Sequence, residues 1–186
     1  MVKSISLTLS GGEFELVYGT DFSVTSDSLN HLVYEKDDVW YVVSDPQHTK
    51  YAKTTITIPY QSIFYTVLIN ITDGVLEMCK TSCEHIFFYI KNATVEADTV
   101  SQRLRIAVGH GNARIRAKAS YINIDCGYGT IDLHPEHIKN GYKINSKCGM
   151  GNVTLNSAVL PKQYVSQEGE RQIEVICGMG EVNIYT

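Results

Sequence analysis

Apolar and polar residues alternate along most of the chain with the period of two that is typical of β-strands. One alternating phrase, CGMGNVTL at residues 148–155, recurs almost unchanged as CGMGEVNI at residues 177–184. Two related phrases, CGYGTIDL at 126–133 and VGHGNARI at 108–115, precede them. Repetition of this kind indicates an array of similar structural units that stack to share one core.

The second glycine of each phrase is an anchor on which the repeats align. The series extends toward the N-terminus, and its anchors are Gly74, Ala93, Gly111, Gly129, Gly151 and Gly180. The intervals between anchors are nearly equal except for the last two, which are longer. We expect glycine here because the chain bends sharply between two strands, often with φ above zero, where a Cβ would clash.

Four columns of the alignment are apolar and are predicted to point inward. They lie three and seven residues before the anchor, and two and four residues after it. The first of these columns reads Ile71, Ile90, Val108, Cys126, Cys148 and Cys177. The column two residues after the anchor reads Leu76, Val95, Ala113, Ile131, Val153 and Val182.

The positions between these apolar columns are mostly polar and are predicted to face solvent. Six residues before the anchor stand Arg105, Asn123, Asn145 and Glu174, and three residues after it stand Arg114, Asp132, Thr154 and Asn183. Stacked units of this kind pair each strand with its equivalent in the next unit, in parallel. The chain is therefore predicted to be all-β, a single-stranded parallel β-helix (a solenoid) of about six rungs.

The N-terminal segment reads differently from the repeats. ISLTL, EFELVY, DFSVTS, HLVYEK and VWYVVS are separated by turn-forming residues, and EKDDVW is typical of a tight hairpin. We expect one domain over residues 1–186, in which residues 1–52 form an antiparallel strand cap and residues 53–186 form the coils. The stretch TTITIP leads into the coils, and Pro59 ends its strand.

The strand-rich N-terminal segment, the strand ending in TITIP and the repeated G-x-G-x-[apolar]-x-[apolar] corners resemble the bacterial putative-adhesin domain family of unknown function, also called the toastrack domain. The resemblance covers nearly the whole chain, from Ile5 to Ile184. It implies a single-stranded β-helix, commonly attached to membrane-associated or envelope-stress proteins, with no established enzymatic role. Such motifs are structural, so they specify the fold and not an activity.

Charge and composition exclude some partners. The net charge is -4 at pH 7 and the isoelectric point is about 5.8, so no basic footprint for nucleic acid is present. The sequence contains neither an apolar run long enough to span a membrane nor the continuous apolar core of a signal peptide. As written, the chain is expected to be cytoplasmic without direct membrane insertion, and envelope-associated if the family resemblance holds.

The cysteines and histidines do not predict a metal or cofactor site. The five cysteines include no CxxC pair, and three of them follow the repeat, so we expect free structural thiols in an inward ladder. His134, Glu136 and His137 form the stretch HPEH, which lacks a helical frame and a third suitably spaced ligand. We interpret it as a solvated loop.

Two classes of catalytic solenoid are alternatives to a non-catalytic coil. Hexapeptide acyltransferases place one aliphatic residue every six positions, whereas Ile122 and Ile124 alternate at two. β-Helical polysaccharide enzymes need paired carboxylates on one outward face, and here Asp125 and Asp132 are expected on opposite sides of the bend. The sequence therefore predicts no catalytic residue, and a carbohydrate-active enzyme remains only a remote alternative.

The predicted function is that of a non-catalytic interaction module, adhesin-like or envelope-associated, with a protein or glycan partner that the sequence does not identify. The alternative is a self-associating scaffold, including a homodimer through the C-terminal coil, because only Tyr185 and Thr186 follow the last repeat. One candidate contact surface is the corner column His110, Tyr128, Met150 and Met179. Asn70, Asn92 and Asn152 begin N-x-T triplets and are interpreted as ordinary solvent-facing residues.

Overall fold

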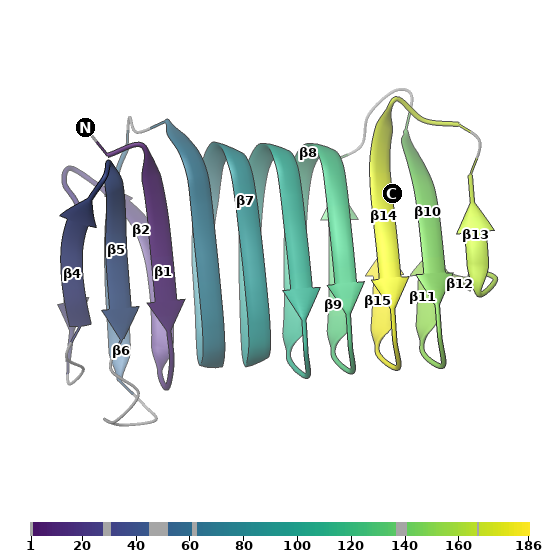
Figure 1. Ribbon diagram of the computed structural model, residues 1–186, viewed down its shortest axis with the longest axis horizontal. Helices are drawn as coiled ribbons and strands as arrows, with labels where there is room; N and C mark the ends of the chain where they lie inside the picture. The colour runs from purple at the N-terminus through teal and green to yellow at the C-terminus, as the bar shows by residue number, and fades with distance from the viewer. Residues whose placement is uncertain (1, 28–30, 45–51, 61–62, 137–140, 167) are drawn as a thin grey trace.

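The computed structural model describes residues 2–27, 31–44, 52–60, 63–136, 141–166 and 168–186. Over these residues the chain winds as a flattened coil with two sheet faces joined at its corners (Figure 1). The strands are β1 (Ser4–Leu9), β2 (Glu13–Gly19), β3 (Ser23–Ser26), β4 (His31–Lys36), β5 (Val39–Ser44), β6 (Lys53–Pro59), β7 (Phe64–Val108), β8 (Asn112–Cys126), β9 (Thr130–Pro135), β10 (Tyr142–Cys148), β11 (Asn152–Leu155), β12 (Ala158–Val159), β13 (Gln163–Val165), β14 (Arg171–Cys177) and β15 (Glu181–Ile184).

The two faces are continuous ladders. On one, here called the β14 face, the order is β4, β5, β1, β7, β8, β14, β10, β13. On the other, the β15 face, the order is β3, β6, β2, β7, β8, β9, β15, β11, β12. All pairs between neighbouring coils are parallel, and only the strands at the two ends pair antiparallel. The predicted all-β parallel β-helix is confirmed.

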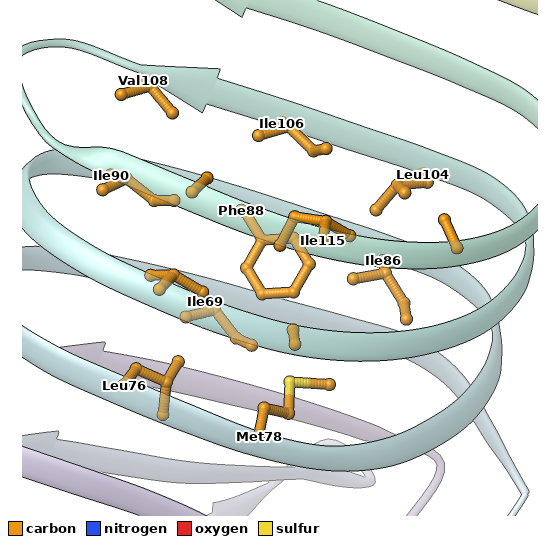
Figure 2. Close-up of a cluster of buried hydrophobic side chains, with 14 of the residues drawn as sticks. Ile69, Leu76, Met78, Ile86, Phe88, Ile90, Leu104, Ile106, Val108 and Ile115 are labelled. Atoms are coloured by element: carbon orange, nitrogen blue, oxygen red, sulfur yellow. The ribbon is translucent and has the colours of Figure 1, made fainter. Parts of the chain in front are cut away.

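The core lies between the two faces, and the predicted inward columns line it. Every residue of these columns is buried except Cys148 and Leu155, which are half-buried in the coil formed by β10 and β11. A further inward column fills the centre of the β14 face, and Figure 2 shows its members Ile69, Phe88 and Ile106. Ile124 continues this column and is also buried. Successive side chains of a strand point to opposite faces of the sheet. A single register between neighbouring coils therefore buries all these apolar columns in the same core.

Most anchors are glycine because the backbone of the neighbouring coil comes too close for a Cβ, and not because φ is positive. Among them only Gly74 has a positive φ, of 114°. A Cβ on Gly129 would collide with the carbonyl oxygen of Gly111, and one on Gly111 would collide with that of Ala93. The predicted need for glycine at the corner therefore stands, but its cause at most corners is the backbone of the neighbouring coil.

The C-terminal coil is inserted into the stack. β14 pairs with β8 on one side and β10 on the other, and β15 pairs with β9 and β11 in the same way. In Figure 1 the yellow β14 lies between the green strands β8 and β10. The prediction of an open edge on the C-terminal coil, and with it a homodimer through that edge, is wrong. The chain skips one position after β9, builds the β10–β11 coil, and then returns to fill the gap.

The N-terminal antiparallel cap is smaller than expected. β1 and β2 form one parallel coil, and β5 and β6 form another outside it. Only β4 on β5 and β3 on β6 are antiparallel. Alternation predicts a strand but not its direction, so the sequence does not distinguish the parallel strands β1, β2, β5 and β6 from the antiparallel strands β3 and β4.

Both ends of the described stack are covered. At the C-terminal end β13 pairs antiparallel with β10 and β12 with β11. At the N-terminal end Phe22 packs against Trp40, with ring centroids 4.7 Å apart, and against Phe64. Capping elements of this kind close the core of a solenoid, which its last coil would otherwise leave open.

Candidate functional site

The strongest candidate site is a row of exposed side chains along one corner of the coil. His110, Tyr128, Met179 and Met150 stand one residue before their anchors and follow one another along the stack in that order. The exposed fractions of Tyr128, Met150 and Met179 are 58%, 77% and 42%. We call these four residues the corner ridge. The sequence predicted its members, and the inserted C-terminal coil makes them contiguous by placing Met179 between the other two coils.

The backbone beneath the corner ridge is hydrogen-bonded from coil to coil. The amide N–H of His110 donates to the carbonyl of Lys91 at 2.8 Å, that of Tyr128 to Gly109 at 2.7 Å, and that of Met179 to Gly127 at 2.8 Å. The rings of His110 and Tyr128 are parallel, with centroids 4.9 Å apart. Side chains that are already ordered lose less conformational entropy when a partner binds.

A shallow groove of about 410 Å³ adjoins the corner ridge on the β14 face. Gly109 and Gly127 form part of its floor, and Tyr89, Lys91 and Asp125 line it. The groove exists because the glycines of the CGxG and VGHG phrases carry no side chain at a position that Lys91 fills one coil earlier. The guanidinium of Arg105 lies over the Tyr89 ring, 5.9 Å from its centroid. The groove combines an aromatic ring with charged groups of both signs.

The cysteines form the predicted inward ladder, in an order that the sequence does not give. Cys177 pairs in register with Cys126 on one side and Cys148 on the other. The Cys126 thiol donates to the carbonyl of Gly129 at 3.1 Å, and the Cys177 thiol to that of Gly180 at 3.2 Å. Each thiol thus ties its strand to the anchor glycine that follows, which gives the cysteine of the phrase a structural role.

The buried thiols of Cys83, Cys126 and Cys177 are poor nucleophiles. Burial raises the pKa of Cys177 to about 12, with Cys148 and Cys126 adding to the shift. Burial also raises the pKa of Cys126, and it raises that of Cys83 to about 12. Because the thiolate is the reactive form, thiols held protonated in a core are chemically inert. All five cysteines are free in the structure.

The carboxylates and histidines weighed from the sequence do not converge. Asp125 is exposed on the β14 face, whereas Asp132 lies on the β15 face and accepts a hydrogen bond from Asn183 at 3.1 Å. His134 stacks on Tyr185 at 4.5 Å, and Glu136 pairs with Lys118 at 3.0 Å. His137 lies outside the described residues. Within the described part of the chain no group of three or more His, Cys, Asp or Glu side chains is placed to hold a metal ion.

The predicted outward columns mostly face solvent, with one exception. Thr154 is buried, because β12 covers it and its hydroxyl donates to Asn183 at 2.7 Å. Glu174 accepts hydrogen bonds from Tyr121 and Gln172. Of the three N-x-T asparagines, Asn92 and Asn152 are exposed, and Asn70 is half-buried beside the groove. Asp132, Asn183 and Thr154, three residues after their anchors, thus form a hydrogen-bonded ladder across three coils.

Sequence reasoning missed a charged hollow on the β15 face. A cavity of about 400 Å³ is lined by Glu15, Glu77, Glu96, Asp98, Arg114 and Arg116, among others. Glu15 lies in register with Glu77, and Glu96 with Arg114. The signal was present in the sequence, because GGEFEL carries an anchor at Gly12 with Phe14 and Leu16 at the apolar positions after it. Assigning this segment to an antiparallel cap hid the acidic column.

Comparisons with known proteins identify structural neighbours only. No protein-family model matches the chain, and no curated protein matches it. A putative cell adhesion protein from Clostridium sporogenes is similar in structure, with a TM-score of 0.48 and 13% identity over 99% of this chain and 93% of that one. A putative adhesin from Bacteroides fragilis has a TM-score of 0.39 and 13% identity over 99% and 91% of the two chains.

The fold assignment rests on the strand register of this chain itself. No helix long and apolar enough to cross a membrane occurs among the described residues.

Proposed function

We propose that this chain is a non-catalytic β-solenoid interaction module, adhesin-like in type, that binds a protein partner through the corner ridge. The observation that carries the proposal is the contiguity of Tyr128, Met179 and Met150 as exposed side chains on a hydrogen-bonded backbone. Aromatic residues and methionine are enriched in the buried centres of protein interfaces, and methionine adapts its shape to a partner. The family resemblance further suggests a partner at the bacterial envelope.

A glycan partner is the second candidate, and the groove beside the corner ridge favours it. Tyr89 offers a ring, while Asn70, Lys91 and Asp125 offer hydrogen-bonding groups around the same shallow cavity. Ligand sites generally combine an apolar surface with a few polar groups that fix orientation. This candidate uses the groove rather than the corner ridge, so variants can separate the two.

Binding measurements on two matched double variants test the proposal. The purified chain is screened on an envelope-protein array and a glycan array, and its affinity for each hit is measured. Tyr128→Ser with Met150→Ser is expected to weaken protein binding about thirtyfold, the loss of roughly 2 kcal/mol typical of a hot spot. Tyr60→Ser with Ile63→Ser, at exposed positions outside the corner ridge, is expected to leave binding unchanged.

Two outcomes would contradict the proposal. Equal effects of the two double variants would exclude the corner ridge as the binding surface. Turnover of a bound glycan would exclude a non-catalytic role. Loss of glycan binding in Tyr89→Ser, with an intact corner ridge, would favour the groove instead.

A further inference from the structure

Among the described residues, β4 is the outermost strand of the β14 face at the N-terminal end, and no described strand pairs with its second edge. It pairs with β5 and ends the strand order of that face (Figure 1). It spans six residues, whereas the end strands β12 and β13 span two and three. Short end strands protect a sheet from pairing with another chain, and β4 lacks this protection.

β4 exposes apolar side chains on both of its surfaces, although it also carries His31, Glu35 and Lys36. The exposed fractions of Leu32, Val33 and Tyr34 are 62%, 40% and 39%. Tyr34 stacks on Tyr41 of β5, with centroids 4.7 Å apart, on the outer side of the sheet. A long apolar edge strand of this kind is a template for an added strand.

The hairpin geometry shows which backbone groups of β4 are available. Asp37 and Asp38 have φ of 52° and 60°, the values of a two-residue type I′ turn. Lys36 and Val39 flank this turn and form a hydrogen-bonded pair, and hydrogen-bonded pairs then alternate along the ladder. The N–H and C=O groups of His31, Val33 and Glu35 therefore point away from β5, toward the outer edge.

We infer that β4 pairs antiparallel with β4 of a second copy of this chain, about a two-fold axis that passes through Val33. Antiparallel pairing aligns residues whose backbone groups face the partner, so Val33 meets Val33, Glu35 or His31 of the second copy. Pairing Val33 with Val33 sets Leu32 opposite Tyr34 and extends the apolar strip that Tyr41 begins. Pairing it with Glu35 sets Leu32 opposite Lys36 and places apolar beside charged side chains, and pairing it with His31 sets Tyr34 opposite a residue outside β4.

The dimer is symmetric, so it closes without forming a filament. It is also weak, because one strand pair buries less than the roughly 1,200 Å² found in stable complexes. The two solenoids join at their N-terminal ends and keep both corner ridges exposed. Pairing through β4 does not rest on the proposed function, since its surface is separate from the corner ridge, but it would make the module bivalent.

Sedimentation velocity across a range of concentrations tests the inference. The wild-type chain is expected to shift from 20.8 kDa toward twice that mass as its concentration rises. Val33→Lys is expected to remain monomeric, because the axis brings the two introduced charges together. Val165→Lys, at an exposed position of the other end strand β13, is expected to dimerise as the wild type does. A wild-type chain that stays monomeric up to its solubility limit would overturn the inference.

A mixture of two variants tests the register. Val33→Glu alone is expected to be monomeric, like Val33→Lys, but the two variants mixed in equal amounts are expected to regain the dimer. Only a register in which residue 33 meets itself gives this rescue. Failure of the mixture to dimerise, while thermal melts show both variants folded, would overturn the two-fold axis through Val33.

Discussion

Cys177 in β14 lies in register beside Cys126 in β8, although Cys148 separates the two in the sequence. The core ladder therefore runs Cys126, Cys177, Cys148, and the last coil of the chain is an internal coil of the stack. Each of its strands has hydrogen-bonded neighbours on both sides. The C-terminal segment thus completes the core rather than ending it.

Removal of residues 171–186 should therefore unfold the C-terminal half rather than trim it. The segment buries Ile173, Val175, Cys177, Val182 and Ile184. Burying each aliphatic side chain is worth about 1.5 to 3 kcal/mol, and their sum is comparable with a total stability of about 5 to 15 kcal/mol. Urea denaturation measures the loss, with removal of only Tyr185 and Thr186 as the control. A truncated chain as stable as the control would contradict the inserted position.

Replacement by alanine should affect stability very differently at two neighbouring residues of a central coil. Ile124 is fully buried and Asn123 is half-exposed on the opposite side of β8. Ile124→Ala is expected to cost about 2 to 5 kcal/mol, and Asn123→Ala to stay within about 0.5 kcal/mol of the wild type. Denaturant melts of the two variants check this. Similar losses at both positions would mean that the inward register is misassigned.

The two glycines of one corner should differ although neither has a positive φ. A Cβ on Gly129 would collide with the Gly111 backbone, whereas one on Gly127 would lie 3.1 Å from the Gly109 carbonyl oxygen, close but adjustable. We expect Gly129→Ala to cost about 3 kcal/mol and Gly127→Ala less than about 1 kcal/mol. Thermal melts compare the two. If Gly127→Ala is the more damaging variant, the close approach at the anchor is not what selects glycine.

The raised thiol pKa values predict a loss of stability at alkaline pH. Cys177 has a folded pKa of about 12 against an ordinary value of 9.0. Between these values the unfolded chain releases a proton that the folded chain retains, so stability is full below pH 9 and falls as pH rises toward 12. Urea melts at about pH 8 and about pH 11 measure the decrease, which should be smaller in Cys177→Ala. An identical decrease in the variant would show that other groups cause it.

The sequence predicted the coils built on the six anchors but not the order in which they stack. Period-two alternation places Ile122 and Val182 inward because one face of every strand must be buried, whichever strand lies beside it. The phrases at 126–133, 148–155 and 177–184 are nearly interchangeable, so no local feature says which is the middle one. The longer intervals around Gly151 were the available signal, since a chain that skips a position and returns needs longer connections.

The candidate site was predicted only in part for the same reason. His110, Tyr128, Met150 and Met179 could be assigned to one corner column from the alignment, but their contiguity depends on the inserted coil. The acidic residues Glu15 and Glu77 were not brought together, because parallel and antiparallel strands share the same alternation. The groove exists because Gly109 and Gly127 have no side chains. This can be recognised only once the neighbouring coils are placed side by side.

Scalar couplings across backbone hydrogen bonds, measured by NMR on the isotope-labelled chain, test the coil order most directly. The inserted C-terminal coil predicts that the amide of Glu181 couples to the carbonyl of Gly129, and that the amide of Asn152 couples to the carbonyl of Gly180. Stacking in sequence order predicts instead a coupling from the Asn152 amide to the Gly129 carbonyl. Observing the first pair would establish the inserted coil, and observing the coupling between Asn152 and Gly129 would contradict it.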